Sequence, residues 1–280
     1  MDFRYWGMCV WQSGGDYITF KDVDLSYIGG SDQHNDYTTR FGNGLQMWQG
    51  IHDITIERCR IDNVYDAGIT PQGTAASYTT YNIYIRNNII SNCEYSIEFW
   101  ERTGSTTHDV YIENNTLIDA GGGWAHNQRP TGRYSGPLGC HFYIPAFSGT
   151  KSDIYIRNNI LYNATESIII LTYITDIDNM VLDYNSYYQS VGGGAIGYLY
   201  VGTITYSTFA GWKIASSQEA HAINSDPLFM SVLNFHLQST SLAINAGITT
   251  SLTTDYDGYV RNIPPSIGAY DYDSNPTSRQ

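Results

Sequence analysis

The residues with the clearest capacity for chemistry are one carboxylic acid, one histidine and the aromatic rings beside them. Glu98 stands in the phrase Ser96-Ile-Glu-Phe-Trp, and His141 stands in the phrase Gly139-Cys-His-Phe-Tyr. If these phrases are neighbouring strands in register, the two Cβ atoms lie about 5 Å apart and the side chains can share a proton. Trp100 would reduce the solvation of Glu98 and raise its pKa towards the range of an acid catalyst. The alternative is a Glu–His hydrogen bond that only stabilises the sheet.

The elements that would position these side chains come from a phrase that the chain repeats. Each copy alternates apolar and polar residues, which is typical of a strand and not of a helix. The spacers between copies are unequal, as in a solenoid whose coils keep their strands and vary their loops. Two further short strands follow each copy, so three strands per coil predict a parallel β-helix with rungs about 4.8 Å apart. The copies begin at Ile18, Ile54, Ile83, Val110, Ile154 and Met180.

Three columns of side chains follow from this register, and we interpret all three as structural. An asparagine ladder is expected because Asn tolerates a left-handed turn and its amide can bond to the next rung. A column of alternating charge would help to set the register, and a column of tyrosines would stack. The ladder comprises Asn88, Asn115, Asn159 and Asn185, the charges Lys21, Glu57, Arg86, Glu113, Arg157 and Asp183, and the stack Tyr84, Tyr111 and Tyr155.

The third strand of each coil predicts two outward rows on one face. Aromatic rings beside hydrogen-bonding groups suit sugars, whose C–H faces stack and whose hydroxyls need partners. We therefore expect a saccharide groove along this strand column, although the aromatic residues could instead pack under the long loops. The first row is Gln46, Thr70, Glu98, His141, Ile169 and Gly197, and the second is Trp48, Gln72, Trp100, Tyr143, Leu171 and Leu199.

Two long spacers are expected to flank this strip on one side of the scaffold, where binding and catalytic residues are usually found. The glycine run at residues 121–123 lacks the lysine of a phosphate-binding loop. The second spacer is predicted either to contribute to the site or to form a compact structural loop that packs on Trp124. The first spacer, 28–43, carries Asp32, His34, Asp36 and Arg40, and the second, 120–138, carries Trp124, His126, Arg129, Arg133 and Tyr134.

Composition limits the partners that this chain can bind. The formal net charge of −13 argues against nucleic acid and against anionic membranes. No apolar run is long enough to span a membrane, and no signal peptide precedes Met1, which opens almost directly onto a rung. A solenoid of this kind normally has its open end covered, so an upstream segment is expected.

No metal or other cofactor is predicted. The acidic spacer from Asp32 to Asp36 has oxygen ligands suited to calcium, but it lacks the EF-loop pattern. His34, His126 and His141 share no spacing typical of zinc. The cysteines Cys59, Cys93 and Cys140 are interpreted as core residues.

The final part of the chain completes a resemblance to a known family. After the rungs, Phe209, Trp212 and Ala215 suggest a short helix, and phrases such as Asp226-Pro-Leu-Phe and Ile267-Gly-Ala-Tyr-Asp follow. With the repeats, they resemble the right-handed parallel β-helix family of carbohydrate-active proteins over essentially the whole chain. The resemblance implies an all-β, single-stranded right-handed solenoid with about six or more rungs over residues 1–204. Residues 205–280 would form a capping segment of the same domain, and an extracellular or cell-surface location is implied.

Such a family includes hydrolases, lyases, epimerases and binding proteins, so the reaction must be argued from the site. A glycoside hydrolase needs two carboxylates, with Glu98 as the acid and Asp66, Glu101, Asp32 or Asp36 as the partner. A lyase or epimerase acting on uronates would use His141 or His126 with Arg129 or Arg102. The acidic surface favours hydrolysis of a neutral polysaccharide or oligosaccharide, and a non-catalytic, tailspike-like glycan-binding module is the third hypothesis. The residues expected to bind substrate are Gln46, Trp48, Thr70, Gln72, Trp100, Arg102, Trp124, Arg133 and Tyr143.

Overall fold

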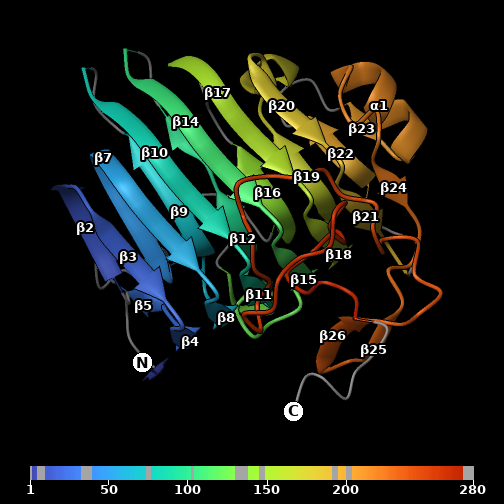
Figure 1. Cartoon of the computed structure of the whole chain (residues 1–280). Helices are drawn as coiled ribbons and strands as arrows, with labels where there is room; N and C mark the ends of the chain where they lie inside the picture. Colours follow the sequence, from blue (N-terminus) through green and yellow to red (C-terminus); the bar gives the residue numbers. More distant parts are fainter. Residues whose placement is uncertain are drawn as a thin grey trace.

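The computed structural model describes residues 2–4, 10–32, 40–73, 77–101, 104–129, 138–144, 149–190, 195–199 and 204–273. The fold is predominantly β, and its strands form long parallel sheets whose neighbours come from successive passes of the chain (Figure 1). One sheet contains β1 (Asp2–Arg4), β4 (Asp24–Ile28), β8 (Arg60–Val64), β11 (Ile89–Ser91), β15 (Thr116–Ala120), β18 (Ile160–Ala164), β21 (Ser186–Tyr188) and β24 (Ile223–Asn224).

The second large sheet consists of two stacks that the long strand β7 (Leu45–Glu57) joins, and their strands are parallel except for the antiparallel pair β22–β23. Residues 45–48 of β7 pair with β9, whereas residues 52–57 pair with β10. The first stack, called the site stack below, contains β2 (Val10–Gly15), β9 (Ala67–Gly73), β12 (Tyr95–Glu98), β13 (Trp100–Glu101), β16 (Cys140–Ile144), β19 (Ser167–Leu171), β22 (Ala195–Leu199) and β23 (Thr205–Tyr206). The second, called the tyrosine stack, contains β3 (Ile18–Lys21), β10 (Thr79–Arg86), β14 (Thr106–Glu113), β17 (Thr150–Arg157) and β20 (Met180–Asp183).

Short elements complete the chain. They are the pairs β5 (Ser31–Asp32) with β6 (Arg40–Phe41) and β25 (Phe229–Ser231) with β26 (Asn234–Leu237), the 3₁₀ turns η1 (His126–Gln128) and η2 (Ile174–Ile177), and helix α1 (Phe209–Ser216). Each pass of the chain adds one strand to each parallel stack, an arrangement compatible with a β-helix-like solenoid. Isoleucine, leucine and valine side chains from the first sheet, the site stack and the tyrosine stack fill one continuous core.

The asparagine ladder is confirmed. The Asn115 Oδ1 accepts hydrogen bonds from the Asn88 backbone N–H and from its Nδ2, both at 3.0 Å. The same pattern links Asn115 to Asn159 and Asn159 to Asn185, and all four side chains are buried. The left-handed conformation belongs to the preceding residues, such as Asn114 at φ 54°, and not to the ladder residues themselves. The ladder therefore owes its asparagines to hydrogen bonding and not to backbone conformation.

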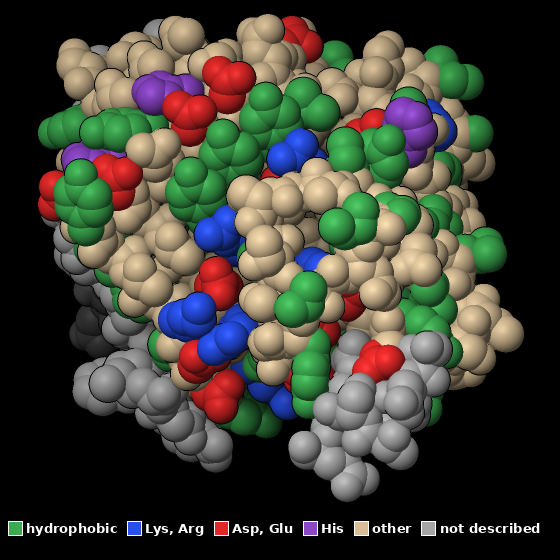
Figure 2. Space-filling model, in the orientation of Figure 1, with side chains coloured by type: hydrophobic (Ala, Val, Ile, Leu, Met, Phe, Trp, Pro, Cys, Tyr) green, Lys and Arg blue, Asp and Glu red, His purple; other side chains and the backbone are tan. Residues whose placement is uncertain are grey.

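The other two columns are also confirmed on the outer face of the tyrosine stack. Lys21 and Arg86 both approach Glu57, at 2.9 and 3.5 Å, and Arg157 donates to Glu113 at 2.7 Å. The tyrosine rings stack at centroid distances of 5.0 and 5.5 Å, and hydrophobic side chains line up over these strands in Figure 2. The stacked rings are Tyr84, Tyr111 and Tyr155.

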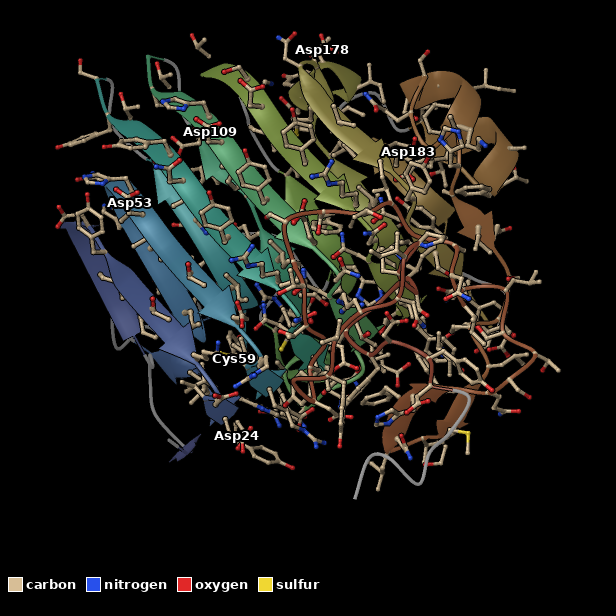
Figure 3. All side chains as sticks on the ribbon, in the orientation of Figure 1. Asp24, Asp53, Cys59, Asp109, Asp178 and Asp183 are labelled. Carbon is tan, nitrogen blue, oxygen red and sulfur yellow. The ribbon has the colours of Figure 1, made fainter. Side chains whose placement is uncertain are left out.

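A second aromatic stack runs along the same face, formed by His52, Tyr81 and His108. The Nδ1 of each histidine lies within 2.8 Å of the carboxylate that follows it in the chain. Those carboxylates are Asp53 and Asp109, which project from the outer side of the tyrosine stack (Figure 3). The stacked rings therefore cover each other's faces and help to hold neighbouring strands in register.

The C-terminal segment packs against the first sheet. Phe235, Ala269 and Ile267 are buried against side chains of β11, β15 and β18. The buried Arg261 donates to the Asn87 Oδ1 and to the backbone carbonyls of Gly268 and Ala269. The predicted short helix is present as α1, and its Trp212 is buried in the main core.

Candidate functional site

The outer strip of the site stack has the predicted register at its first strands. Gln46 pairs with Thr70, and Trp48 pairs with Gln72, which in turn pairs with Trp100. These side chains therefore form two adjacent rows across β7, β9 and the β12–β13 segment. Glu98 continues the row of Gln46 and Thr70, because Ile97 pairs with Ile69.

The prediction for the next strand is wrong by two residues, and the strand after it is wrong by one: the row continues through Tyr143 and Ile170, and not through His141 and Ile169. Ile169 lies in the main core. Glu98 pairs with Tyr143 and not with His141. His141 is fully buried, with its Nδ1 2.9 Å from the Ser96 Oγ and its Nε2 3.2 Å from the backbone oxygen of Tyr162 in β18. Burial lowers the pKa of His141 to about 4, so the ring stays neutral. The interpretation of Glu98 and His141 as a proton-sharing pair is therefore corrected.

Glu98 is the titratable group at the centre of the strip. Its Oε2 accepts hydrogen bonds from the Thr70 Oγ1 at 2.9 Å and from the Gln72 Nε2 at 2.6 Å. Burial, and after it the charge of Asp66, raises the pKa of Glu98 to about 7 despite these two bonds. A substantial fraction of the carboxyl groups therefore carries a proton at neutral pH, as an acid catalyst requires.

Aromatic residues occupy neighbouring positions of the strip. Trp48 and Trp100 flank Gln72 in the second row, and both are half-buried. Tyr143 is half-buried beside Glu98, and its ring lies 4.7 Å from that of Tyr95. The strip thus combines a partly neutral acid, side-chain amides and aromatic surface.

Asp66 is the carboxylate that interacts electrostatically with Glu98. Burial raises the pKa of Asp66, while Arg129 opposes that rise. The Arg129 guanidinium donates to the Asp66 Oδ1 at 3.3 Å, to the Tyr65 backbone oxygen at 2.8 Å and to the Tyr95 hydroxyl at 3.2 Å. Its guanidinium also lies over the rings of Tyr65 and Tyr95, at 5.2 and 5.4 Å. Arg129 is thereby committed to contacts within the protein.

Glu94 fastens both ends of the long loop between β15 and β16. Its Oε1 accepts from the backbone N–H groups of Leu138 and Gly139, at 2.6 and 3.1 Å, and its Oε2 lies 3.2 Å from the His126 Nδ1. Burial alone would raise the pKa of Glu94, but His126, Arg129 and the two N–H groups lower it below its ordinary value. The hydrogen bond to Glu94 in turn raises the pKa of His126. The role of Glu94 as the anchor of this loop was not predicted from the sequence.

Local packing explains why glycines and Trp124 occur at these positions of the loop. Gly121 has φ 75°, and a Cβ on Gly123 would lie 2.2 Å from the Asn92 backbone oxygen. The Trp124 indole packs on Tyr65, with ring centroids 5.4 Å apart, and donates to the Asn63 backbone oxygen at 3.1 Å. These contacts match the alternative of a loop that packs on Trp124. At Gly123 the loop lies so close to the Asn92 backbone that only glycine fits.

Gly123→Ala is expected to destabilise this loop. The methyl group has no space against the Asn92 carbonyl, so we expect a loss of about 1–3 kcal/mol in the free energy of unfolding. Thermal denaturation measures the loss, and the fluorescence of Trp124 reports whether its ring has moved. The control is Asn127→Ala, at an exposed position in the same loop as Gly123. Gly258 is less suitable: a Cβ there would meet no atom closer than 3.5 Å, but its φ of 87° disfavours alanine. A Gly123→Ala variant as stable as the wild type would show that the loop is not anchored as described.

Glu101, a predicted catalytic candidate, is fully buried at the end of the strip. Neither of its carboxyl oxygens has a hydrogen-bond partner of good geometry in the described part of the chain. Burial raises its pKa, and the hydroxyls of Ser105, Thr80 and Thr107 oppose that rise only partly. Glu101 is therefore poorly placed to reach a substrate, and its charged form is poorly stabilised.

We expect Glu101→Gln to increase stability at neutral and alkaline pH. A carboxyl whose pKa is raised on folding contributes its full stability below its unfolded pKa and loses it as the pH rises through the folded value. The neutral amide has no such loss, so the expected gain in the free energy of unfolding is about 1–3 kcal/mol at pH 8 and is absent at pH 4. Urea denaturation at both pH values measures it, with Glu166→Gln, an exposed position, as the control. A gain that is equal at pH 4 and pH 8 would contradict a titrating Glu101.

Other predicted site residues lie outside the described residues. These are His34, Asp36, Arg102, Arg133 and Tyr134, together with the side chains of Asp32 and Arg40. Within the described ranges, no three His, Cys, Asp or Glu side chains converge as metal ligands. No helix among the described residues is long and apolar enough to cross a membrane.

Comparison with protein-family models found no match to this chain, and comparison with curated proteins found none either.

Proposed function

We propose that this protein is a glycoside hydrolase that acts on a neutral polysaccharide or oligosaccharide along the outer strip of the site stack. The observation that supports this proposal most is Glu98, a buried carboxyl with a pKa of about 7 on a strip that also carries half-buried aromatic residues. A glycosidase needs one carboxyl that is protonated at the working pH and can donate to the leaving oxygen. In the proposal, the fold is a right-handed parallel β-helix of the carbohydrate-active kind, and the protein works outside the cell.

Asp66 is our proposed second carboxylate. It is the candidate whose charge acts on Glu98, whereas Glu101 is enclosed elsewhere. In this mechanism, the Glu98 proton passes to the glycosidic oxygen as the bond to the anomeric carbon breaks. A water molecule adds to the anomeric carbon, and the Asp66 carboxylate accepts its proton. Arg129 holds the Asp66 Oδ1 and so orients that carboxylate.

The same contacts weigh against a lyase that uses Arg129 and His141. A lyase needs a cation free to neutralise a uronate carboxylate, and a base that can reach the C5 proton. The Arg129 guanidinium already bonds to Asp66, Tyr65 and Tyr95, and His141 is enclosed. The negative net charge of −13 also disfavours an anionic polymer.

A substrate panel tests the function directly. The protein is incubated with neutral and uronic polysaccharides, and both reducing ends and the ultraviolet absorbance of unsaturated products are followed. We expect new reducing ends without new absorbance. New absorbance would support a lyase instead, and binding without any product would support a non-catalytic glycan-binding module.

A further inference from the structure

Three side-chain amides form a directed chain of hydrogen bonds that ends on Glu98. The Asn43 Nδ2 donates to the Gln46 Oε1 at 3.1 Å, and the Gln46 Nε2 donates to the Gln72 Oε1 at 3.3 Å. The Gln72 Nε2 then donates to the Glu98 Oε2 at 2.6 Å. The chain crosses three neighbouring strands, β7, β9 and β12, and every amide donates towards Glu98.

The direction of this chain is set at its far end by the backbone. The Ala67 N–H donates to the Asn43 Oδ1 at 3.0 Å, so the Asn43 nitrogen must face Gln46. Reversing any one amide would bring two oxygens or two NH₂ groups together. Because Asn43, Gln46 and Gln72 are all buried, water cannot replace the lost bonds, and the reversed orientations are disfavoured.

Both donors to Glu98 converge on the same oxygen. The Thr70 Oγ1 donates to Oε2 at 2.9 Å, as the Gln72 Nε2 does. No described residue bonds to Oε1. An oxygen that already accepts two hydrogen bonds is the acceptor oxygen of a neutral carboxyl, so the acidic proton belongs on the other oxygen.

We propose that Asn43, Gln46 and Gln72 are positioning residues: their amide chain, with Thr70, makes Oε2 of Glu98 the acceptor and leaves Oε1 to carry the proton that the enzyme delivers. The inference rests on the proposed function in that Glu98 acts as the acid. The proton moves from Oε1 to the glycosidic oxygen as the bond to the anomeric carbon breaks, and Glu98 is left as a carboxylate. The amides would then stabilise that carboxylate through the same Oε2.

A purely structural role for the amides makes a different prediction. If the amides only held the strands together, removing them would lower stability. Replacing Gln46, which does not contact Glu98, would then leave the pKa of Glu98 unchanged. The test therefore measures protonation directly, with protein labelled by ¹³C at the glutamate carboxyl carbons. Carbon NMR follows the Glu98 carboxyl through a pH titration. Its signal is assigned as the one that is missing in Glu98→Gln.

We expect Gln72→Leu and Thr70→Val each to move the pKa of Glu98 above about 7, because each removes a donor that favours the charged form. Gln46→Leu should move it in the same direction by a smaller amount, and the Gln46→Leu/Gln72→Leu double variant should move it no further than Gln72→Leu alone. Thr70→Ser, which keeps the hydroxyl, should restore the wild-type titration. Thr55→Val, the same chemical change on the tyrosine stack, is the matched control and should leave it unchanged. If Gln46→Leu does not fold, Gln46→Met replaces it, because it is unbranched and closer in shape.

Infrared spectroscopy of the protonated form tests which oxygen carries the proton. If Oε2 is the carbonyl oxygen, removing either donor raises the frequency of the Glu98 carbonyl stretch; an unchanged frequency would overturn the assignment. An unchanged titration in both Gln46 variants, or a double variant whose shift equals the sum of the single shifts, would overturn the amide chain. These readouts do not depend on turnover. Shifts of the expected pattern without hydrolysis of any glycan would refute the proposed function alone, and hydrolysis without the shifts would refute the inference alone.

Discussion

Glu98→Gln should reduce glycan hydrolysis by about 10²–10⁴-fold, the usual contribution of a positioned acid catalyst. Glutamine keeps the shape of the side chain and can accept hydrogen bonds from Thr70 and Gln72, so the strip is expected to stay intact. It has no acidic proton to donate to the leaving oxygen. Initial rates measured by reducing ends, with circular dichroism as a check on folding, give the result.

The pH profile of the wild type provides a second readout of the same residue. The acid must be protonated, so the rate should fall as the pH rises above about 7, the pKa of Glu98. Glu166→Gln, at an exposed position, is the matched control and should keep both the rate and the profile. Full activity in Glu98→Gln, or a rate that stays constant from pH 6 to pH 9, would remove Glu98 from the mechanism.

Asn115→Ala should cause the largest loss of stability, more than about 3 kcal/mol in the free energy of unfolding. The side chain donates to the Ile85 backbone oxygen and to the Asn159 Oδ1, and it accepts two hydrogen bonds from Asn88. Alanine removes the side-chain partners of the Asn88 backbone N–H and of the Ile85 carbonyl, and each buried group left unsatisfied costs about 1–3 kcal/mol. The Asn159 Oδ1 still accepts from the Asn115 backbone N–H, and the Asn88 Nδ2 still donates to the Ile56 carbonyl. Urea denaturation measures the change.

Asn127→Ala is the matched control for the ladder. Asn127 is exposed on η1, so its replacement should change the free energy of unfolding by less than about 0.5 kcal/mol. An Asn115→Ala variant that is nearly as stable as the wild type would mean that the ladder contributes little. A loss of the same size in Asn127→Ala would mean that asparagines stabilise this chain for some other reason.

The repeated strands and their columns could be predicted because they depend on local alternation and on one recurring spacing. The phrases at Ile83, Val110 and Ile154 are in register, and the tyrosines that follow each of them stack. The position of Glu98 on the outer strip, beside Thr70 and next to the row of Trp100, could be predicted for the same reason. Its raised pKa was also expected, although burial as a whole and the charge of Asp66 cause it.

The neighbour of Glu98 on the next strand could not be predicted in the same way. A shift of two residues leaves the alternation of a strand unchanged, so the sequence does not distinguish His141 from Tyr143 at that position. The structure pairs Tyr143 with Glu98 and encloses His141 against Ser96. The role of the second spacer was equally hidden, because the contacts of Trp124 and Arg129 with Asn63, Tyr65 and Asp66 span more than sixty residues of sequence.

By itself, the sequence determined the parallel strand columns, the asparagine ladder and the outer strip that holds Glu98, because each arises from a pattern repeated in every rung. Only the tertiary structure decided what surrounds that carboxyl. The amide chain from Asn43 through Gln46 to Gln72 is made of residues that recur in no repeat, and its direction depends on one backbone N–H of Ala67. Hydrogen bonds between such residues depend on exact spacing between distant segments, which local periodicity does not encode.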